Sequence, residues 1–202
     1  MRKITAGLFM SLDGVVADPQ DWHFPYFDDA MGAAVDAQLG STDTLLLGRV
    51  TYDGFADAWP GREAEGGADA AFAKKLGDAR KLVVTHQDRD LSWRNSERLD
   101  GELTVAAAAL KEEPGGDIAI SGSVSVVRQL LVAGLLDELH LLVHPIVVGK
   151  GERLFEEGTT IPLRLLSSEA FGTGVLHSVY TKDDAAPSGS YEEAKAHLAQ
   201  EE

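Results

Sequence analysis

The chain has 202 residues, of which 44% are hydrophobic, and its formal net charge is −15. This length and composition predict one compact domain with a sizeable core, and no apolar run approaches the ~20 residues that a membrane-spanning helix needs. The acidic balance argues against general nucleic-acid binding, and the absence of cysteine excludes disulfides, thiolate nucleophiles and cysteine-ligated zinc.

The first half of the chain alternates strand-like and helix-like patterns. The apolar stretch at 3–12 is broken by polar residues, so we interpret it as a first strand and not as a signal peptide. A helix is expected from about Phe27 to Gly40, because glycine is typical of helix C-terminal caps. The other elements expected here are a buried strand at 44–48, a short helix at 51–59, a loop at 60–69, a helix at 70–79 and a strand at 81–87.

The second half continues the alternation. The elements expected are a strand at 102–106, a helix at 107–113, a strand at 117–123, a helix at 124–135, a long strand at 137–149 and a last strand at 174–182. Strands that alternate with helices favour parallel pairing, whereas the last two strands suggest an antiparallel edge. We therefore predict an α/β fold with a mixed sheet flanked by helices. An acidic tail follows at 183–202, with a linker and then a short helix expected from residue 191.

Three strand-to-helix junctions carry residues suited to an anion. Ligands gather beyond the C-terminal ends of parallel strands, where helices present unpaired N–H groups. At the first junction Gly48 allows a close backbone approach, Arg49 matches the geometry of a phosphate, and Thr51 offers a hydroxyl. An ordinary helix cap beside a surface arginine is the alternative interpretation.

The other two junctions are weaker signals when each is taken alone. Val84, Thr85 and His86 lead a buried strand into polar residues that suit a ribose or an adenine-side phosphate, although every strand end must become polar somewhere. The third junction, at 121–125, has the sequence SGSVS, whose small side chains would let a pyrophosphate reach backbone N–H groups. It matches neither GxGxxG nor a Walker loop, and a tight turn is the alternative.

Five segments in order give the chain a resemblance to a known family. They are MSLDG (10–14), LLLGRVTYDGF (45–55), KLVVTHQ (81–87), IAISGSVSVVRQLL (118–131) and DELHLLVHPIVVGKGERLF (137–155). Together they resemble the dihydrofolate reductase superfamily, and more closely its bacterial branch related to the reductase domain of riboflavin biosynthesis. The resemblance extends to about Lys182, so we expect a reductase domain at 1–182 and an acidic tail at 183–202.

The resemblance implies a fold and an activity. The fold would be a three-layer one, with a mixed, mostly parallel sheet of about eight strands. NADPH would lie across the C-terminal strand ends and transfer hydride to a pteridine-like or aminopyrimidine-like molecule. A cytoplasmic location and a homodimer are also expected. Two alternatives stay open, namely a nucleotide-binding protein without turnover and the riboflavin-pathway 5-amino-6-(ribosylamino)uracil reductase.

The resemblance also implies the cofactor contacts. The first junction would hold cofactor phosphates, with Arg49 favoured, the second would border the adenosine 2′-phosphate and adenine, and the third would wrap the pyrophosphate. The residues so assigned are Gly48, Arg49, Thr51, Val84, Thr85, His86, Ser121, Gly122, Ser123, Val124 and Ser125. Dihydrofolate reductases carry a cis Gly-Gly peptide at the third junction, where this chain has Ser121-Gly122, and the isomer here is left open.

The substrate side is less specified. Asp13, near the nicotinamide, and Asp28, in the place of the carboxylate that holds the pterin, are the catalytic candidates. An acidic first helical turn is the alternative for Asp28. The substrate contacts expected are Leu12, Gly14, Trp22 and Tyr52. The aromatic cluster Trp22, Phe24, Tyr26 and Phe27 would either stack on a flat heterocycle or cover the core.

Metal chemistry is not expected. His140 and His144 share a strand face and His177 lies on a neighbouring strand, but no carboxylate follows an established metal-ligand spacing. The zinc deaminase found beside some relatives requires paired cysteines, so deaminase activity is excluded.

Overall fold

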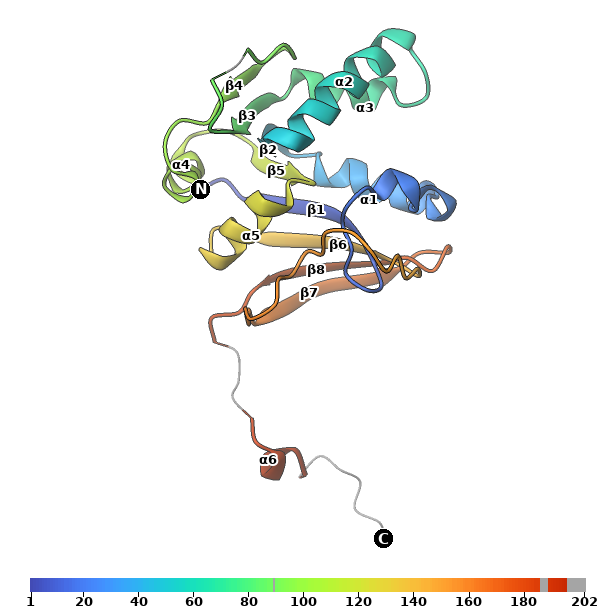
Figure 1. The fold of residues 1–202 in the computed structure, drawn as a ribbon, viewed down its shortest axis with the longest axis vertical. Helices are drawn as coiled ribbons and strands as arrows, with labels where there is room; N and C mark the ends of the chain where they lie inside the picture. Colours follow the sequence, from blue (N-terminus) through green and yellow to red (C-terminus); the bar gives the residue numbers. More distant parts are fainter. Residues whose placement is uncertain (89, 186–188, 196–202) are drawn as a thin grey trace.

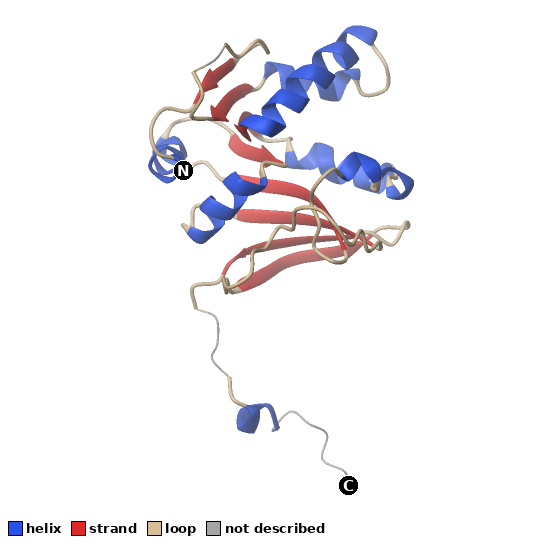
Figure 2. Cartoon of the chain, viewed as in Figure 1, coloured by secondary structure: helices blue, strands red, loops and turns tan. Residues whose placement is uncertain are grey.

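The computed structural model describes residues 1–88, 90–185 and 189–195, and its centre is one eight-stranded sheet (Figures 1 and 2). The strand order is β4-β3-β2-β5-β1-β6-β8-β7. The strands are β1 (Ile4–Ser11), β2 (Thr42–Gly48), β3 (Arg80–Val84), β4 (Ser96–Arg98), β5 (Asp117–Ser121), β6 (Glu138–His144), β7 (Leu163–Ala170) and β8 (Leu176–Lys182). Neighbours from β4 to β6 are parallel, and β8 runs antiparallel to both β6 and β7.

In the described part of the chain, five helices flank the sheet. They are α1 (Asp29–Gln38), α2 (Arg49–Glu65), α3 (Ala70–Asp78), α4 (Leu103–Glu112) and α5 (Val124–Val132), with 3-10 turns η1 (Pro19–Asp21) and η2 (Phe24–Tyr26). The short α6 (Tyr191–Lys195) follows the last strand in the chain and has no buried residues. Among the described residues, no helix is both long and apolar enough to cross a membrane. The expected α/β fold with a mixed, mostly parallel sheet is confirmed.

Burial on both faces explains the three layers. Leu46 of β2 packs into a cluster with residues of α4 and α5, whereas its neighbours Leu45 and Leu47 pack on the other face with residues of α2 and α3. All three leucines are at most 1% exposed. A strand buried on both faces reads as a continuous apolar run, as TLLLG does, and it is typical of a parallel sheet covered by helices on either side.

Two expected elements are corrected. The expected loop at 60–69 is helical as far as Glu65, because α2 continues through Pro60 while Trp59 packs against the core. The expected strand at 102–106 is the start of α4, whose N-terminus is capped by Glu102. An apolar run that follows a carboxylate is compatible with a strand or with a capped helix. Here the carboxylate of Glu102 accepts hydrogen bonds from the N–H groups of Thr104 and Val105, which stabilises the helix.

Two strands were not anticipated. β4 has three residues and little apolar character. β7 contains a register shift between Leu165 and Ser167, which breaks the alternation by which a strand is recognised. The long strand expected at 137–149 ends at His144, immediately before Pro145, which has no N–H to donate to a ladder.

Candidate functional site

The candidate site lies where three parallel strands end side by side. β3, β2 and β5 are consecutive in the sheet. Gly48 at the end of β2 is in register with Val84 at the end of β3. β2 also pairs in parallel with β5, with Leu45 opposite Ala119 shortly before both strands end. The structure thus brings all three predicted junctions together at the C-terminal ends of these strands, and this row of strand ends is called the strand-end edge below.

The first and third junctions are joined by reciprocal hydrogen bonds. The N–H of Gly48 donates to Oγ of Ser123 at 2.9 Å, and the N–H of Ser123 donates to Oγ1 of Thr51 at 3.0 Å. Each junction therefore supplies the hydroxyl that satisfies a backbone donor of the other. This fixes the starts of α2 and α5 against each other.

The turn between β5 and α5 requires left-handed backbone. Gly122 has φ +62° and Ser123 has φ +50°. A Cβ on Gly122 would lie 3.3 Å from Oγ1 of Thr51, which is tight and adds to the conformational reason for glycine. The described residues contain no cis peptide bond, so the Ser121-Gly122 bond is trans.

Two helices begin at this edge without a cap from their own side chains. Neither Gly48, the N-cap of α2, nor Ser123, the N-cap of α5, makes a side-chain capping bond. By contrast, Asp28 caps α1 and Glu102 caps α4, each carboxylate accepting first-turn N–H groups. First-turn N–H groups have no intrahelical acceptor and carry the positive end of the helix dipole. The edge therefore offers two adjoining helix starts to an anion.

Arg49 stands at the first position of α2. One guanidinium nitrogen lies 3.2 Å from Oδ2 of Asp53, one turn along the helix, and the side chain is 41% exposed. Exposed pairs of this kind contribute little to stability. Arg49 therefore lies at the strand-end edge and is accessible to a ligand. Its guanidinium would have to exchange the ion pair with Asp53 for one with the ligand.

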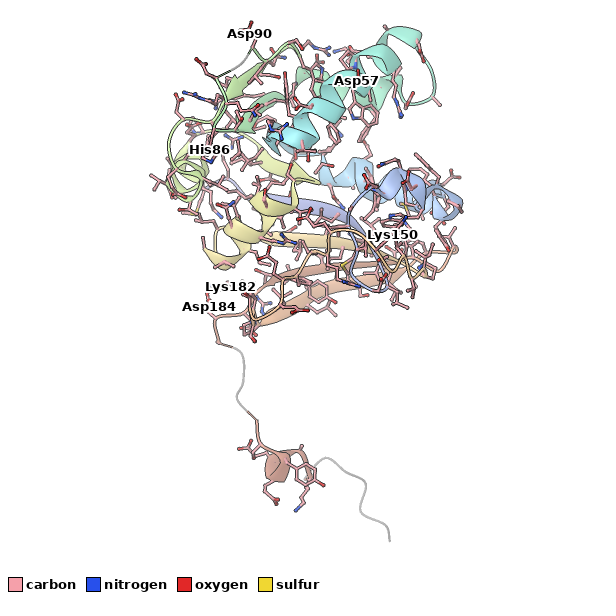
Figure 3. All side chains as sticks on the ribbon, viewed as in Figure 1. Asp57, His86, Asp90, Lys150, Lys182 and Asp184 are labelled. Atoms are coloured by element: carbon pink, nitrogen blue, oxygen red, sulfur yellow. The ribbon has the colours of Figure 1, made fainter. Side chains whose placement is uncertain are left out.

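The second junction extends the edge beyond β3. Oγ1 of Thr85 accepts a hydrogen bond from the N–H of Gln87, which shapes the turn, and His86 is exposed. In Figure 3 the labelled His86 lies on the left of the view and Lys150 on the right. The ends of β3, β2 and β5 lie in a row along the sheet, which suits an extended ligand better than a compact one.

Asp13 anchors the loop that follows β1. Its carboxylate accepts hydrogen bonds from Oγ of Ser11 at 2.7 Å and from the N–H groups of Val148 and Gly149 at 3.0 and 2.9 Å. The Ser11 bond, together with the two backbone bonds, lowers the pKa of Asp13 to about 2. Asp13 is therefore a carboxylate at neutral pH and ties this loop to the loop after β6.

The same loop holds two of the expected substrate contacts. Leu12 is 66% exposed, although its N–H donates to the carbonyl of Ile146. Gly14 has φ +85°, and its carbonyl accepts from the N–H of Leu154. Leu12 therefore has a side chain free to contact a ligand, whereas Gly14 serves the turn that pairs the two loops.

The aromatic segment before α1 encloses two histidines that sequence analysis did not single out as a pair. His23 stacks on Phe9 with ring centroids 4.5 Å apart, and His144 of β6 lies edge-on to Trp22 at 5.2 Å. The two imidazoles are 6.1 Å apart. Nδ1 of His23 and Nε2 of His144 are buried and have no hydrogen-bond partner among the described residues. Burial, with a smaller contribution from His144, lowers the pKa of His23 to about 4.

The remaining substrate-side candidates divide between surface and core. Oδ1 of Asp28 accepts from the N–H of Met31 at 2.9 Å, which is the helix-capping alternative, and its catalytic role stays a prediction. Trp22 is 7% exposed and donates to the carbonyl of Ala17. Tyr52 is 1% exposed in the core and its hydroxyl accepts from a backbone N–H, so its expected contact with a substrate stays an untested prediction.

The histidines on β6 and β8 form a pair elsewhere. Nδ1 of His140 and Nε2 of His177 are 3.1 Å apart, and Glu138 approaches the other nitrogen of His140 at 3.2 Å. His144, four residues on, lies in the aromatic segment instead. No group of three or more potential metal ligands occurs among the residues that the structure describes.

Two surface hollows lie away from the strand-end edge. One, of about 590 Å³, lies between α1 and the strands β1, β6 and β8, and the His140–His177 pair lines it. The other, of about 600 Å³, lies beside β3 and β4. The candidate site is an open edge of backbone donors, and neither hollow includes the three junctions.

Comparison with known proteins gives the family. The family described as the RibD C-terminal domain matches residues 2–177. An uncharacterized protein of Bacillus subtilis, YyaP, is 27% identical over 183 residues, which are 89% of this chain and 94% of the relative.

Solved structures agree in fold. A pyrimidine reductase-like protein from Corynebacterium diphtheriae aligns with a TM-score of 0.61 at 17% identity, covering 90% of this chain and 92% of that one. Dihydrofolate reductase from Enterococcus faecalis, complexed with NADP(H) and RAB-propyl, aligns with a TM-score of 0.58 at 16% identity, covering 90% of this chain and 97% of that one. The chain therefore belongs to the RibD C-terminal domain family, and it shares its fold with dihydrofolate reductase.

Proposed function

We propose that this chain is an NADPH-dependent reductase of a small pteridine-like or aminopyrimidine-like heterocycle. The observation that carries the proposal is the pair of adjoining helix starts, α2 and α5, locked together through Gly48, Thr51 and Ser123. Both starts lack side-chain caps, whereas the starts of α1 and α4 are capped by carboxylates that would repel a phosphate. The family and the reductases that share its fold support the same function.

The residues present fit a dinucleotide phosphate. The backbone turns at Gly122 and Ser123 in the left-handed region, and the N–H of Ser123 is held by Thr51. The N–H groups of Val124 and Ser125 follow in the first turn of α5, where no intrahelical acceptor exists, and these are the donors that a phosphate would take. We assign the pyrophosphate to 121–125 and the first turn of α2, and the adenosine side to Arg49, Thr85 and His86. NADPH, when bound, supplies the hydride; the protein supplies position.

The chain's own contribution near the reacting rings is orientation and exclusion of water. Asp13 holds the loop after β1 against the loop after β6, and its low pKa excludes it as a proton donor at neutral pH. Leu12 is exposed on the held loop, whereas Trp22 of the aromatic segment is buried. We retain Asp28 as the carboxylate that would hold a ring nitrogen of the substrate, because its Oδ2 has no bond to a described residue.

A second candidate is a nucleotide-binding protein without turnover. It is favoured by one observation, that both candidate carboxylates, Asp13 and Asp28, already serve structural hydrogen bonds. Such a protein would bind NADPH but would not oxidise it.

Two measurements test the proposal. Titration of NADPH, followed by its fluorescence, should show saturable binding, and absence of saturation would refute a dinucleotide site. Loss of NADPH absorbance should then be followed with dihydrofolate, a pterin, an aminopyrimidine and the ribosylated diaminopyrimidine of riboflavin synthesis. Turnover with the last compound would identify a riboflavin-pathway reductase. Binding of NADPH with no turnover of any of the four compounds would favour the second candidate.

A further inference from the structure

Arg128 lies one turn into α5, and its guanidinium reaches out to the chain that follows β6. Its Nε donates to the carbonyl of Leu154 at 2.8 Å, and one terminal nitrogen donates to the carbonyl of Arg153. The other terminal nitrogen pairs with the carboxylates of Glu152 at 3.0 Å and Glu156 at 2.7 Å. The side chain is 22% exposed. Because a guanidinium presents its N–H groups in one rigid fork, these four contacts fix the whole segment against α5.

The segment that Arg128 holds, residues 152–156, is bonded in turn to the loop after β1. The N–H of Val16 donates to the carbonyl of Glu152 at 2.9 Å, and the N–H of Leu154 donates to the carbonyl of Gly14 at 3.0 Å. The loop after β1 is therefore tied to α5 through the 152–156 segment.

Packing supports the same connection from beneath. Leu154 is 0% exposed and Val16 is 6% exposed, and both lie in the hydrophobic cluster that contains Val127 and Leu130 of α5. Side chains packed at the density of a protein interior resist movement of one part without the others. The loop, the segment and the helix are thus held as one unit.

The connection matters because α5 and the loop after β1 lie at two ends of the proposed dinucleotide site. The start of α5, over 121–125, is assigned to the pyrophosphate, and the loop that carries Leu12 and Asp13 is assigned to the neighbourhood of the reacting rings. One dinucleotide meets both only if their separation matches its own length. Arg128 belongs to neither end, since its guanidinium bonds to the 152–156 segment.

We propose that Arg128 is a positioning residue, which sets the loop after β1 relative to the start of α5 so that the nicotinamide half of the cofactor meets its contacts. The inference rests on the proposed function, and it gives a role to a side chain that touches neither cofactor nor substrate. The adenosine and pyrophosphate half needs only the strand-end edge. Loss of the Arg128 fork therefore weakens the nicotinamide half alone.

Two ligands separate the halves of the cofactor, namely NADPH and 2′-phospho-ADP-ribose, which is NADPH without its nicotinamide. Arg128→Lys keeps the charge but loses the rigid fork, so calorimetric titration should show Kd for NADPH raised about fivefold or more, and Kd for the fragment changed less than about twofold. Arg94→Lys is the matched control and should change neither Kd. Arg94 also pairs with two carboxylates, those of Glu63 at 2.7 Å and Asp78 at 2.9 Å. It precedes β4, however, and so lies at the N-terminal ends of the parallel strands.

A second variant cuts the connection at the loop. Nε of Arg153 donates to the carbonyl of Asp13 at 3.0 Å, and the Arg153 side chain is 55% exposed. Arg153→Ala should therefore leave the fold intact and show the same selective loss, which decides the matter if circular dichroism shows that Arg128→Lys is unfolded. Both variants should also be cut faster by protease near 12–17 without any ligand.

The outcomes separate the two proposals. A wild type that binds neither ligand saturably would refute the proposed function. If the wild type binds both ligands, an equal shift of both Kd values in the variants, or no shift in either, would overturn the role of Arg128 and leave the dinucleotide site standing. A general loss of stability would not produce the selective effect on NADPH.

Discussion

Replacing Gly122 by alanine perturbs the turn on which the dinucleotide site is built. At φ +62° an alanine pays about 1–2 kcal/mol for the left-handed conformation. Its Cβ would also lie 3.3 Å from Oγ1 of Thr51, so the hydrogen bond from Ser123 to that oxygen is expected to weaken, at a further cost of about 1 kcal/mol. We expect Gly122→Ala to lower the free energy of unfolding by about 2–3 kcal/mol, which for ~200 residues is a fall in Tm of roughly 5–10 °C.

The same substitution should cost NADPH affinity. Displacing the start of α5 removes hydrogen bonds to a charged group, each worth about 1.5–3 kcal/mol, so Kd should rise tenfold or more. Gly54→Ala is the matched control, because a Cβ there meets no atom within 4 Å and alanine favours the interior of α2. Urea unfolding and fluorescence titration of both variants check the pair. If Gly122→Ala matched the wild type in stability and in Kd, the reasoning about this turn would be wrong.

Three further substitutions probe the rest of the edge. Arg49→Ala should weaken NADPH more than NADH in parallel titrations, whereas an equal loss for both would move this arginine to the pyrophosphate. Asp13→Asn should free the loop after β1, which would be seen as faster proteolysis near 12–17. The pKa of Asp13 in the folded wild type is lowered from 3.8 to about 2, so the wild type should lose the stability that this carboxylate contributes only as pH falls below ~4. His23 has a folded pKa of about 4 against an ordinary 6.5, so the unfolded state binds the extra proton and stability should fall by up to about 3 kcal/mol as pH drops from 6.5 to 4. His23→Phe should flatten that part of the urea-derived pH profile, and an unchanged slope would contradict the burial argument.

The sequence located the strand-end edge because its signals are local. A buried run that stops at Gly48, and another that stops at Ser121, mark strand ends whichever partners they take. Parallel pairing then requires the ends to meet, and β3, β2 and β5 do meet. The capping role of Asp28 was also foreseeable, since an acidic residue before a helix is a common cap.

What the sequence could not locate depends on contacts between distant segments. His23 and His144 are more than a hundred residues apart, and only the packing of the aromatic segment on β1 and β6 brings them together. Tyr52 follows Thr51 in the first turn of α2, yet helical rotation turns it into the core while Thr51 faces the edge. The bulge in β7 interrupts the alternation of apolar and polar residues, so this strand could not be recognised from the sequence pattern.

Hydrogen exchange on the full chain, with and without NADPH, tests most directly whether the starts of α2 and α5 bind the cofactor. Bound NADPH should slow amide exchange at the start of α2, over 48–51, and at the start of α5, over 122–125. The starts of α1 and α4, already capped by carboxylates, serve as internal references and should not change. Unchanged exchange at α2 and α5 under saturating NADPH, or protection confined to the capped helices, would contradict it.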